Sequence, residues 1–161
     1  MVRRVFYSFH YDLDNSRVQQ IMNIGAIEGS KSATPQDWES VKRGGEDAIK
    51  RWINSQLDGK SCTIVLIGKE TAERKFVRYE IEKSWKDGKG LFGIHIHNLK
   101  DLSGRQSVKG ANPFDTFSFG SSSFASVVPV YDPNSWDAYN DIRTNLASWI
   151  EHAVQNRQKY S

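Results

Sequence analysis

Residues 61–67 read SCTIVLI, a short and nearly unbroken apolar run with several β-branched side chains. Runs of this kind are typical of a central strand in a parallel sheet, because both faces of such a strand are buried. The Asp58-Gly59 pair before the run favours a stop for a preceding helix. The segment therefore predicts a sheet that is covered by helices on both faces.

The sequence around this run alternates between strand and helix patterns. Residues 2–9 and residues 90–97 predict two further strands. Residues 127–131 predict a short last strand at a sheet edge, because Pro129 has no amide to donate to a neighbour. This alternation predicts an α/β fold in which one domain, residues 1–161, has an open and mostly parallel sheet with helices on both sides.

Helices are expected between and after these strands. Thr34 and Thr71 are the expected N-caps of two of them, since a threonine hydroxyl can accept from the first free amides. Each glycine of the Gly44-Gly45 pair costs a helix about 1 kcal/mol relative to alanine, so a kink or a split is expected there. The expected helices cover residues 12–24, residues 34–57 and residues 71–87, followed by a final helix with an inward stripe of Tyr139, Ile142, Leu146, Trp149, Ile150 and Ala153. Loops are expected over residues 25–32 and 98–126, which are rich in glycine and serine.

The composition is that of an ordinary globular protein. Of the 161 residues, 38% are hydrophobic and 25% are charged, which is enough for one domain with a real core. The formal net charge is only +3, and the basic runs are no longer than Arg3-Arg4 or Lys42-Arg43. This argues against a nucleic acid as partner and favours an anionic small molecule.

Cys62 is the one cysteine of the sequence and lies inside the apolar run, so no internal disulfide can form. We expect its thiol to pack as a small apolar group rather than to react, since nothing basic stands beside it in the sequence. The apolar stretch after Arg3-Arg4 is too short for a signal peptide, and no apolar run approaches the roughly 18 residues that span a bilayer. The expected location is therefore the cytoplasm, without a membrane partner.

Two further patterns have simple structural explanations. Residues 88–93 match the glycine spacing of a dinucleotide-binding turn, but that turn must follow a strand and open a helix, whereas this one follows a helix and opens a strand. His95 and His97 lie on one face of the expected strand, but no third metal ligand is evident nearby. We therefore expect structural or pocket-lining histidines and no metal.

Glu80 is the candidate catalytic residue. It lies in the segment FVRYEI, residues 76–81, on the helix that follows the central strand. A glutamate in mid-helix is usually a solvated surface residue, but Glu80 shares an edge with Phe76 and lies at the margin of the buried stripe. The aromatic segment FYSFHY, residues 6–11, closes the first strand. Aromatic rings can stack on a base while an acid holds a ribose, so a nucleotide pocket is a reasonable hypothesis.

The chain resembles the TIR-like family of bacterial antiphage proteins, the TIR component of Thoeris defence systems. Four groups of segments carry this resemblance and span about residues 3 to 117. They are RVFYSFHY (4–11); Trp38-Glu39 with AIKRWIN (48–54); VLIG (65–68) with VRYEI (77–81); and GIHI (93–96) with GANPFD (110–115). The remaining 40 or so residues match only in general character.

The resemblance implies a flavodoxin-like TIR fold and an NAD-consuming enzyme in which Glu80 breaks the nicotinamide–ribose bond. Ligands of open α/β sheets bind at the carboxyl ends of the strands, where the first strand delivers residues 6–9. We therefore expect Phe6 and Ser8 to line the NAD site. The further candidates are Tyr7, His10, Trp38 and Asn112, with core packing an equal alternative for Tyr7 and Trp38.

The resemblance favours a cyclic ADP-ribose signal that activates a separate effector protein. It implies NAD as substrate with no other cofactor, and assembly with other TIR protomers on activation. Two alternatives stay open at this point: a non-catalytic TIR module that only assembles, and an NAD hydrolase that releases linear ADP-ribose. The two share the fold with the leading hypothesis, and a fold alone does not decide function.

Overall fold

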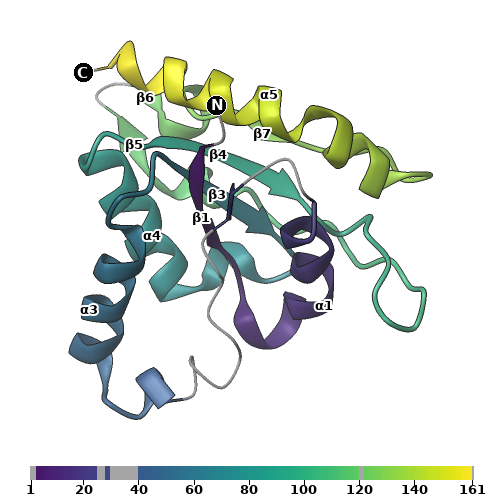
Figure 1. Ribbon diagram of the computed structural model, residues 1–161, viewed down its shortest axis with the longest axis horizontal. Coiled ribbons are helices and arrows are strands. Elements are labelled where there is room, and N and C mark those ends of the chain that lie inside the picture. Colours follow the sequence, from purple (N-terminus) through teal and green to yellow (C-terminus); the bar gives the residue numbers. More distant parts are fainter. Residues whose placement is uncertain (1–2, 25–27, 30–39, 120–121, 161) are drawn as a thin grey trace.

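The computed structural model describes residues 3–24, 28–29, 40–119 and 122–160. Figure 1 shows a twisted sheet with helices on both sides. In chain order, the elements are β1 (Arg4–Ser8), α1 (Tyr11–Met22), β2 (Glu28–Gly29), α3 (Glu46–Leu57), β3 (Cys62–Ile67), the 3₁₀ helix η1 (Thr71–Glu73), α4 (Lys75–Lys86), β4 (Gly90–His95), η2 (Pro113–Thr116), β5 (Ser118–Phe119), β6 (Ser122–Ser123), η3 (Phe124–Ser126), β7 (Val130–Tyr131) and α5 (Ala138–Gln158).

The main sheet has the strand order β2-β1-β3-β4-β7, and all of its pairings are parallel. Every residue of β3 is buried, and β3 lies between β1 and β4. This confirms the central parallel strand that was predicted from its apolar run. β7 lies at an edge, as predicted, and β5 and β6 form a separate antiparallel pair.

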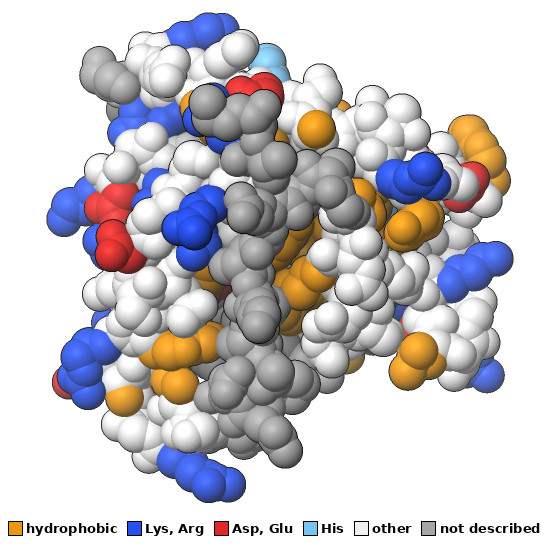
Figure 2. All heavy atoms as spheres, in the orientation of Figure 1, with side chains coloured by type: hydrophobic (Ala, Val, Ile, Leu, Met, Phe, Trp, Pro, Cys, Tyr) orange, Lys and Arg blue, Asp and Glu red, His pale blue; other side chains and the backbone are white. Residues whose placement is uncertain are grey.

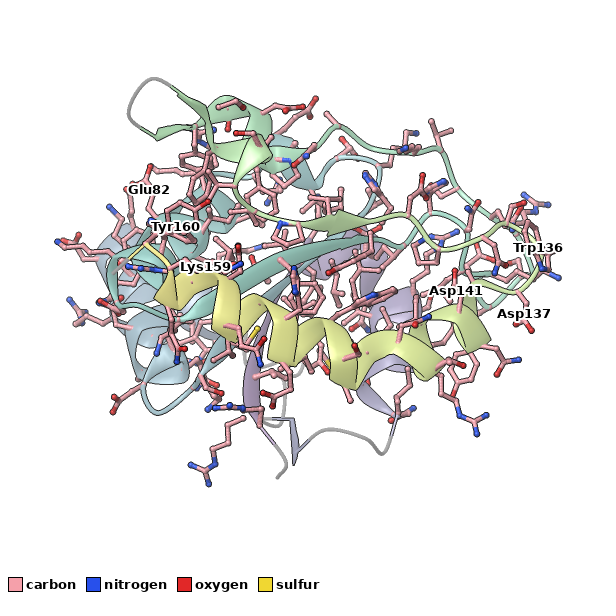
Figure 3. The ribbon with its side chains drawn as sticks, turned by 90° about the horizontal axis from the view of Figure 1, so that it is seen from above. Glu82, Trp136, Asp137, Asp141, Lys159 and Tyr160 are labelled. Atoms are coloured by element: carbon pink, nitrogen blue, oxygen red, sulfur yellow. The ribbon has the colours of Figure 1, made fainter. Side chains whose placement is uncertain are left out.

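α1 and α5 cover one face of the sheet, and α3 and α4 cover the other (Figure 1). Strand residues alternate between these faces, as the two-residue period of a strand requires. Val5 and Tyr7 of β1 thus pack toward α1 and α5, whereas Phe6 packs toward α3. α5 crosses the whole width of the domain, from Asp137 at one end to Lys159 and Tyr160 at the other (Figure 3).

The structure confirms one further expectation and corrects three others. The expected break at Gly44-Gly45 is confirmed, because Gly45 has φ +87 and directly precedes α3. Thr71 does not cap α4; it begins η1, and α4 starts at Lys75 after Arg74. The glycine-rich segment expected as a loop contains the short strand β2, which pairs with β1. Tyr139 is 37% exposed and therefore does not belong to the inward stripe of α5.

The order of the strands creates a topological switch point between β1 and β3. The chain leaves β1 toward α1 on one face and leaves β3 toward α4 on the other. The two connections diverge, and open α/β proteins bind their ligands at switch points of this kind. In the described part of the chain, no helix is long and apolar enough to span a bilayer.

Candidate active site

Glu80 is buried, with only 3% of the residue exposed, and points from α4 to the end of β1. Its inward position follows from helical spacing, because the buried residues of α4 are Val77, Glu80, Ile81 and Ser84. The hydroxyl of Ser8, the last residue of β1, donates a hydrogen bond of 2.6 Å to Oε1 of Glu80. The structure thus excludes the surface alternative and places the carboxyl group at the switch point.

A second hydroxyl pair continues this polar contact along the same helix. Ser84 lies one turn after Glu80, and its Oγ is 2.7 Å from Oγ1 of Thr63 on β3. The side chains of Ser8, Glu80, Thr63 and Ser84 are all buried. We call these four residues the polar seam. It lies between an apolar cluster around Ile81 and a second one around Phe6.

Burial raises the pKa of Glu80 from 4.5 to about 8, although the hydrogen bond from Ser8 lowers it. The reason is that a carboxylate loses its hydration in an apolar site and regains only part of it from one hydroxyl. Near neutral pH the group therefore exists in both protonation states. Perturbed acids of this kind are enriched at functional sites, because chemistry requires groups that change charge near the working pH.

Phe6 lies beside the polar seam. It is two residues before Ser8 and therefore on the same face of β1, and it is 4% exposed. Its apolar neighbours include Ile53 of α3 and the half-buried rings of Phe76 and Tyr79 on α4. Phe6 therefore lies on the same face of the sheet as Glu80, in a cluster with two rings of the helix that carries Glu80.

Tyr7 lies on the opposite face of β1, in the core beneath α1 and α5. Its hydroxyl has no hydrogen-bond partner among the described residues, and burial raises its pKa. The structure does not bring this side chain to Glu80, and it matches the core-packing alternative.

His10 and Asn112 both cap helices at the carboxyl edge of the sheet. His10 follows β1, and its Nδ1 accepts a hydrogen bond of 3.3 Å from the amide of Leu13 in α1. Asn112 accepts a bond of 2.8 Å from the amide of Phe114. Trp38 lies outside the described residues.

The segment before Asn112 packs against the end of β3. A Cβ atom built on Gly110 would lie 1.9 Å from the carbonyl oxygen of Gly68, so only glycine allows this approach. The loop that carries Asn112 is thereby held at the carboxyl edge, near the switch point.

One further feature of this edge has only a weak signal in the sequence. Asp14 of α1 is a second buried acid, at 2% exposed, and its spacing to Val18 and Ile21 on the inward stripe is the signal that could have revealed it.

His95 is also buried, and its ring lies 5.8 Å from that of His97, with burial lowering the pKa of both. Within the described ranges, no group of side chains is suited to hold a metal ion.

Figure 2 shows that lysine and arginine side chains are spread over one face of the molecule and do not gather in one patch. This distribution fits the small net charge of +3. On the face drawn, the described residues therefore form no continuous basic surface of the kind that binds a long polyanion.

The fold and the site define a flavodoxin-like α/β domain with a buried acid at the switch point. The family model described as "Thoeris protein ThsB, TIR-like domain" matches residues 6–101. A protein of Bacillus cereus (strain MSX-D12), described as "Putative cyclic ADP-D-ribose synthase ThsB1", is 39% identical over 149 residues, which cover 88% of this chain and 78% of that protein. The chain therefore belongs to the ThsB TIR-like family, which confirms the resemblance seen in the sequence.

Proposed function

We propose that this protein cleaves the bond between nicotinamide and ribose in NAD and closes the remaining ADP-ribose into a cyclic product. The observation that carries the proposal is the buried Glu80 carboxyl, bonded to Ser8 at the switch point of a parallel sheet. The name of the Bacillus cereus relative, a cyclic ADP-D-ribose synthase, supports the choice of reaction.

The chemistry suits a buried carboxylate. When the glycosidic bond breaks, nicotinamide leaves as a neutral molecule with the bonding electrons, and positive charge develops on the ribose as an oxocarbenium ion. The Glu80 carboxylate stabilises this cation and accepts a hydrogen bond from a ribose hydroxyl. A fixed charge in a dry site is more effective than the same charge in water, because no solvent has to reorganise.

The positive nicotinamide ring also acts on Glu80. A cation close to a buried carboxyl favours its ionised form. Binding of NAD therefore displaces the proton that burial favours when no substrate is bound, so the carboxyl becomes charged when the substrate arrives.

The other site residues follow from their positions at this edge. We propose that Phe6 and Ser8 line the nicotinamide-ribose end of the site, and that His10 and Asn112 line its rim. Trp38 stays a candidate, on the sequence alone, for sheltering bound NAD. Tyr7 supports the strand from the opposite face and does not touch NAD.

The nucleophile that ends the reaction determines the product. A hydroxyl or a base nitrogen of the same ADP-ribose gives the cyclic product and releases a proton, whereas water gives linear ADP-ribose. We propose that the cyclic product is a messenger that activates a separate effector protein in the cytoplasm. NAD is the substrate, no other cofactor takes part, and protomers of the protein assemble when infection activates it.

The test is incubation with NAD, followed by measurement of nicotinamide and of the product mass. Glu80→Gln keeps the size of the side chain and should lower nicotinamide release by about 100-fold or more, as expected when a preorganised group at the transition state is lost. Glu82→Gln is the matched control, since Glu82 is exposed on the same helix (Figure 3).

The mass separates the outcomes, because the cyclic product is one water lighter than linear ADP-ribose. A linear product would replace the cyclase by a hydrolase. No nicotinamide, either from purified protein or from infected cells that express it, would contradict enzymatic function and leave the assembly module.

A further inference from the structure

The feature behind this inference is Asp14, the second buried acid at the switch point. It lies in the first turn of α1, on the opposite face of the sheet from α4. Only 2% of the residue is exposed, although acids in the first turn of a helix are usually solvated. The chemistry proposed for Glu80 does not use it.

The Asp14 carboxylate occupies the space that a side chain at Gly68 would fill. A Cβ atom built on Gly68 would lie 2.2 Å from Oδ2 and 2.5 Å from Cγ of Asp14. Gly68 is the first residue after β3, so the acid packs directly on the turn where the chain leaves the sheet. Any larger residue at position 68 would displace the carboxylate.

Thr71 joins this contact to the start of the next helices. Its hydroxyl oxygen accepts a bond of 2.8 Å from the amide of Gly68 and lies 3.5 Å from Oδ2 of Asp14 and 3.4 Å from the carbonyl of Leu66. Thr71 is fully buried and begins η1, which leads into α4 and so to Glu80. Asp14 therefore contacts both ends of the turn that sets the start of α4.

The surroundings of Asp14 raise its pKa on balance. Burial raises its pKa, while His10 and Arg17 of α1 and the Thr71 hydroxyl lower it, and Glu70 opposes them. Arg17 also donates to the carbonyls of Leu99 and Arg105, at 2.8 and 2.9 Å. Asp14 thus contacts the turn after β3, while its neighbour Arg17 on α1 bonds the loop after β4.

We propose that Asp14 is a positioning residue, which fixes the turn between β3 and η1 through Gly68 and Thr71 and thereby holds Glu80 against Ser8. The catalytic part of this inference rests on the proposed NAD cleavage. Displacement of a catalytic group by about 1 Å can lower a rate by 100-fold, so a small shift of α4 would be enough to matter.

The variants separate shape from charge. Asp14→Ala removes the contact and should lower kcat for nicotinamide release by about 10-fold to 100-fold, with a smaller change in KM. Asp14→Asn keeps the size and an oxygen that can accept from Thr71, so it should retain at least about half of kcat. Asp47→Ala is the control, since Asp47 is an exposed acid in the first turn of α3.

A double-variant cycle tests the contact itself. Gly68→Ala alone should lower kcat about as much as Asp14→Ala, because its methyl group collides with the carboxylate. In the Asp14→Ala background, the same change should cost less than about twofold, since the space is then free. Additive losses would overturn the proposed contact.

A readout without NAD keeps this proposal distinct from the proposed function. Hydrogen exchange of the Gly68 amide should become at least about tenfold faster in Asp14→Ala, and the ¹³C shift of the Glu80 carboxyl should move. If neither changes, the positioning role is overturned whatever the protein does with NAD. It is also overturned if Asp14→Asn is as inactive as Asp14→Ala, because the charge itself would then act, or if Asp14→Ala lowers only the melting temperature and leaves kcat unchanged.

Discussion

The two faces of the central sheet bury their side chains in different ways. Beneath α1 and α5, one continuous apolar cluster extends across β1, β3 and β4. Beneath α3 and α4, two smaller clusters lie on either side of the polar seam. Apolar burial stabilises a fold in proportion to area, whereas a buried acid has a desolvation cost that its partners only partly offset. The apolar cluster beneath α1 and α5 therefore stabilises the domain, and among the described residues Asp14 of α1 is the one buried acid on that side. The polar seam on the other face carries the proposed chemistry at some cost in stability.

The largest effect on stability is expected on the apolar face. Ile142 of α5 is fully buried in the continuous cluster, so Ile142→Ala should lower the free energy of unfolding by about 2–5 kcal/mol through the cavity that it leaves. Urea denaturation measures this, with the exposed Tyr139→Ala as control. The folded fraction should cleave NAD at the normal rate. A loss of activity in folded protein would show that the apolar cluster beneath α5 also supports the site around Glu80.

In the polar seam, by contrast, we expect a substitution that raises the free energy of unfolding. The pKa of Glu80 is 4.5 in the unfolded chain and about 8 in the folded protein, so the folded state binds this proton more tightly. This contribution to stability is present below pH 4.5 and is lost as the pH rises through about 8. Glu80→Gln removes the effect, so the variant should become more stable than the wild type by an amount on the order of a few kcal/mol at high pH.

Thermal unfolding of Glu80→Gln and of the exposed control Glu82→Gln at pH 5 and pH 9 measures this difference. Equal pH dependence in the wild type and Glu80→Gln would show that the carboxyl is not desolvated in solution. The contrast between the two faces would then be lost.

Ser8→Ala should have an intermediate effect, on the pKa of Glu80 and on kcat/KM. It removes the hydrogen bond that lowers the pKa of Glu80, so the pKa should rise further. A hydrogen bond to a charged group contributes about 1.5–3 kcal/mol, which corresponds to a loss of roughly 10-fold to 100-fold in kcat/KM at neutral pH. Steady-state kinetics at several pH values would reveal both changes. Full activity at neutral pH would mean that Ser8 is only a neighbour of the acid.

The smallest net change in the free energy of unfolding is expected for the Thr63–Ser84 pair of the polar seam. Thr63→Val or Ser84→Ala alone leaves one buried hydroxyl without its partner and should cost about 1–3 kcal/mol. The double variant removes both polar groups and should be nearly as stable as the wild type, or within about 1 kcal/mol. Urea denaturation of the four proteins decides this. Additive losses would contradict the pairing.

The sequence was sufficient for the features that depend on local patterns. The apolar run of β3 predicted a central parallel strand, and helical spacing placed Glu80 at the margin of the buried stripe of α4. The period of a strand also implies that Phe6 and Ser8 share one face while Tyr7 faces the other, which the structure shows.

Features that depend on tertiary contacts were not predictable in the same way. β2 is only two residues long, too short for any pattern, and it forms because β1 offers free backbone groups. Thr71 is a residue type that often caps helices, but its hydroxyl oxygen accepts a hydrogen bond from the Gly68 amide instead. Asp14 is buried because Gly68, far away in the sequence, leaves room for its carboxylate.

The pH dependence of kcat/KM for nicotinamide release tests the central claim most directly, because it reports the ionisation of the free enzyme. With Glu80 active as a carboxylate, kcat/KM should rise about tenfold per pH unit from pH 6 and level off above a pKa of about 8. A profile that is flat from pH 6 to pH 9, or one that falls over this range, would contradict a buried glutamate as the catalytic group.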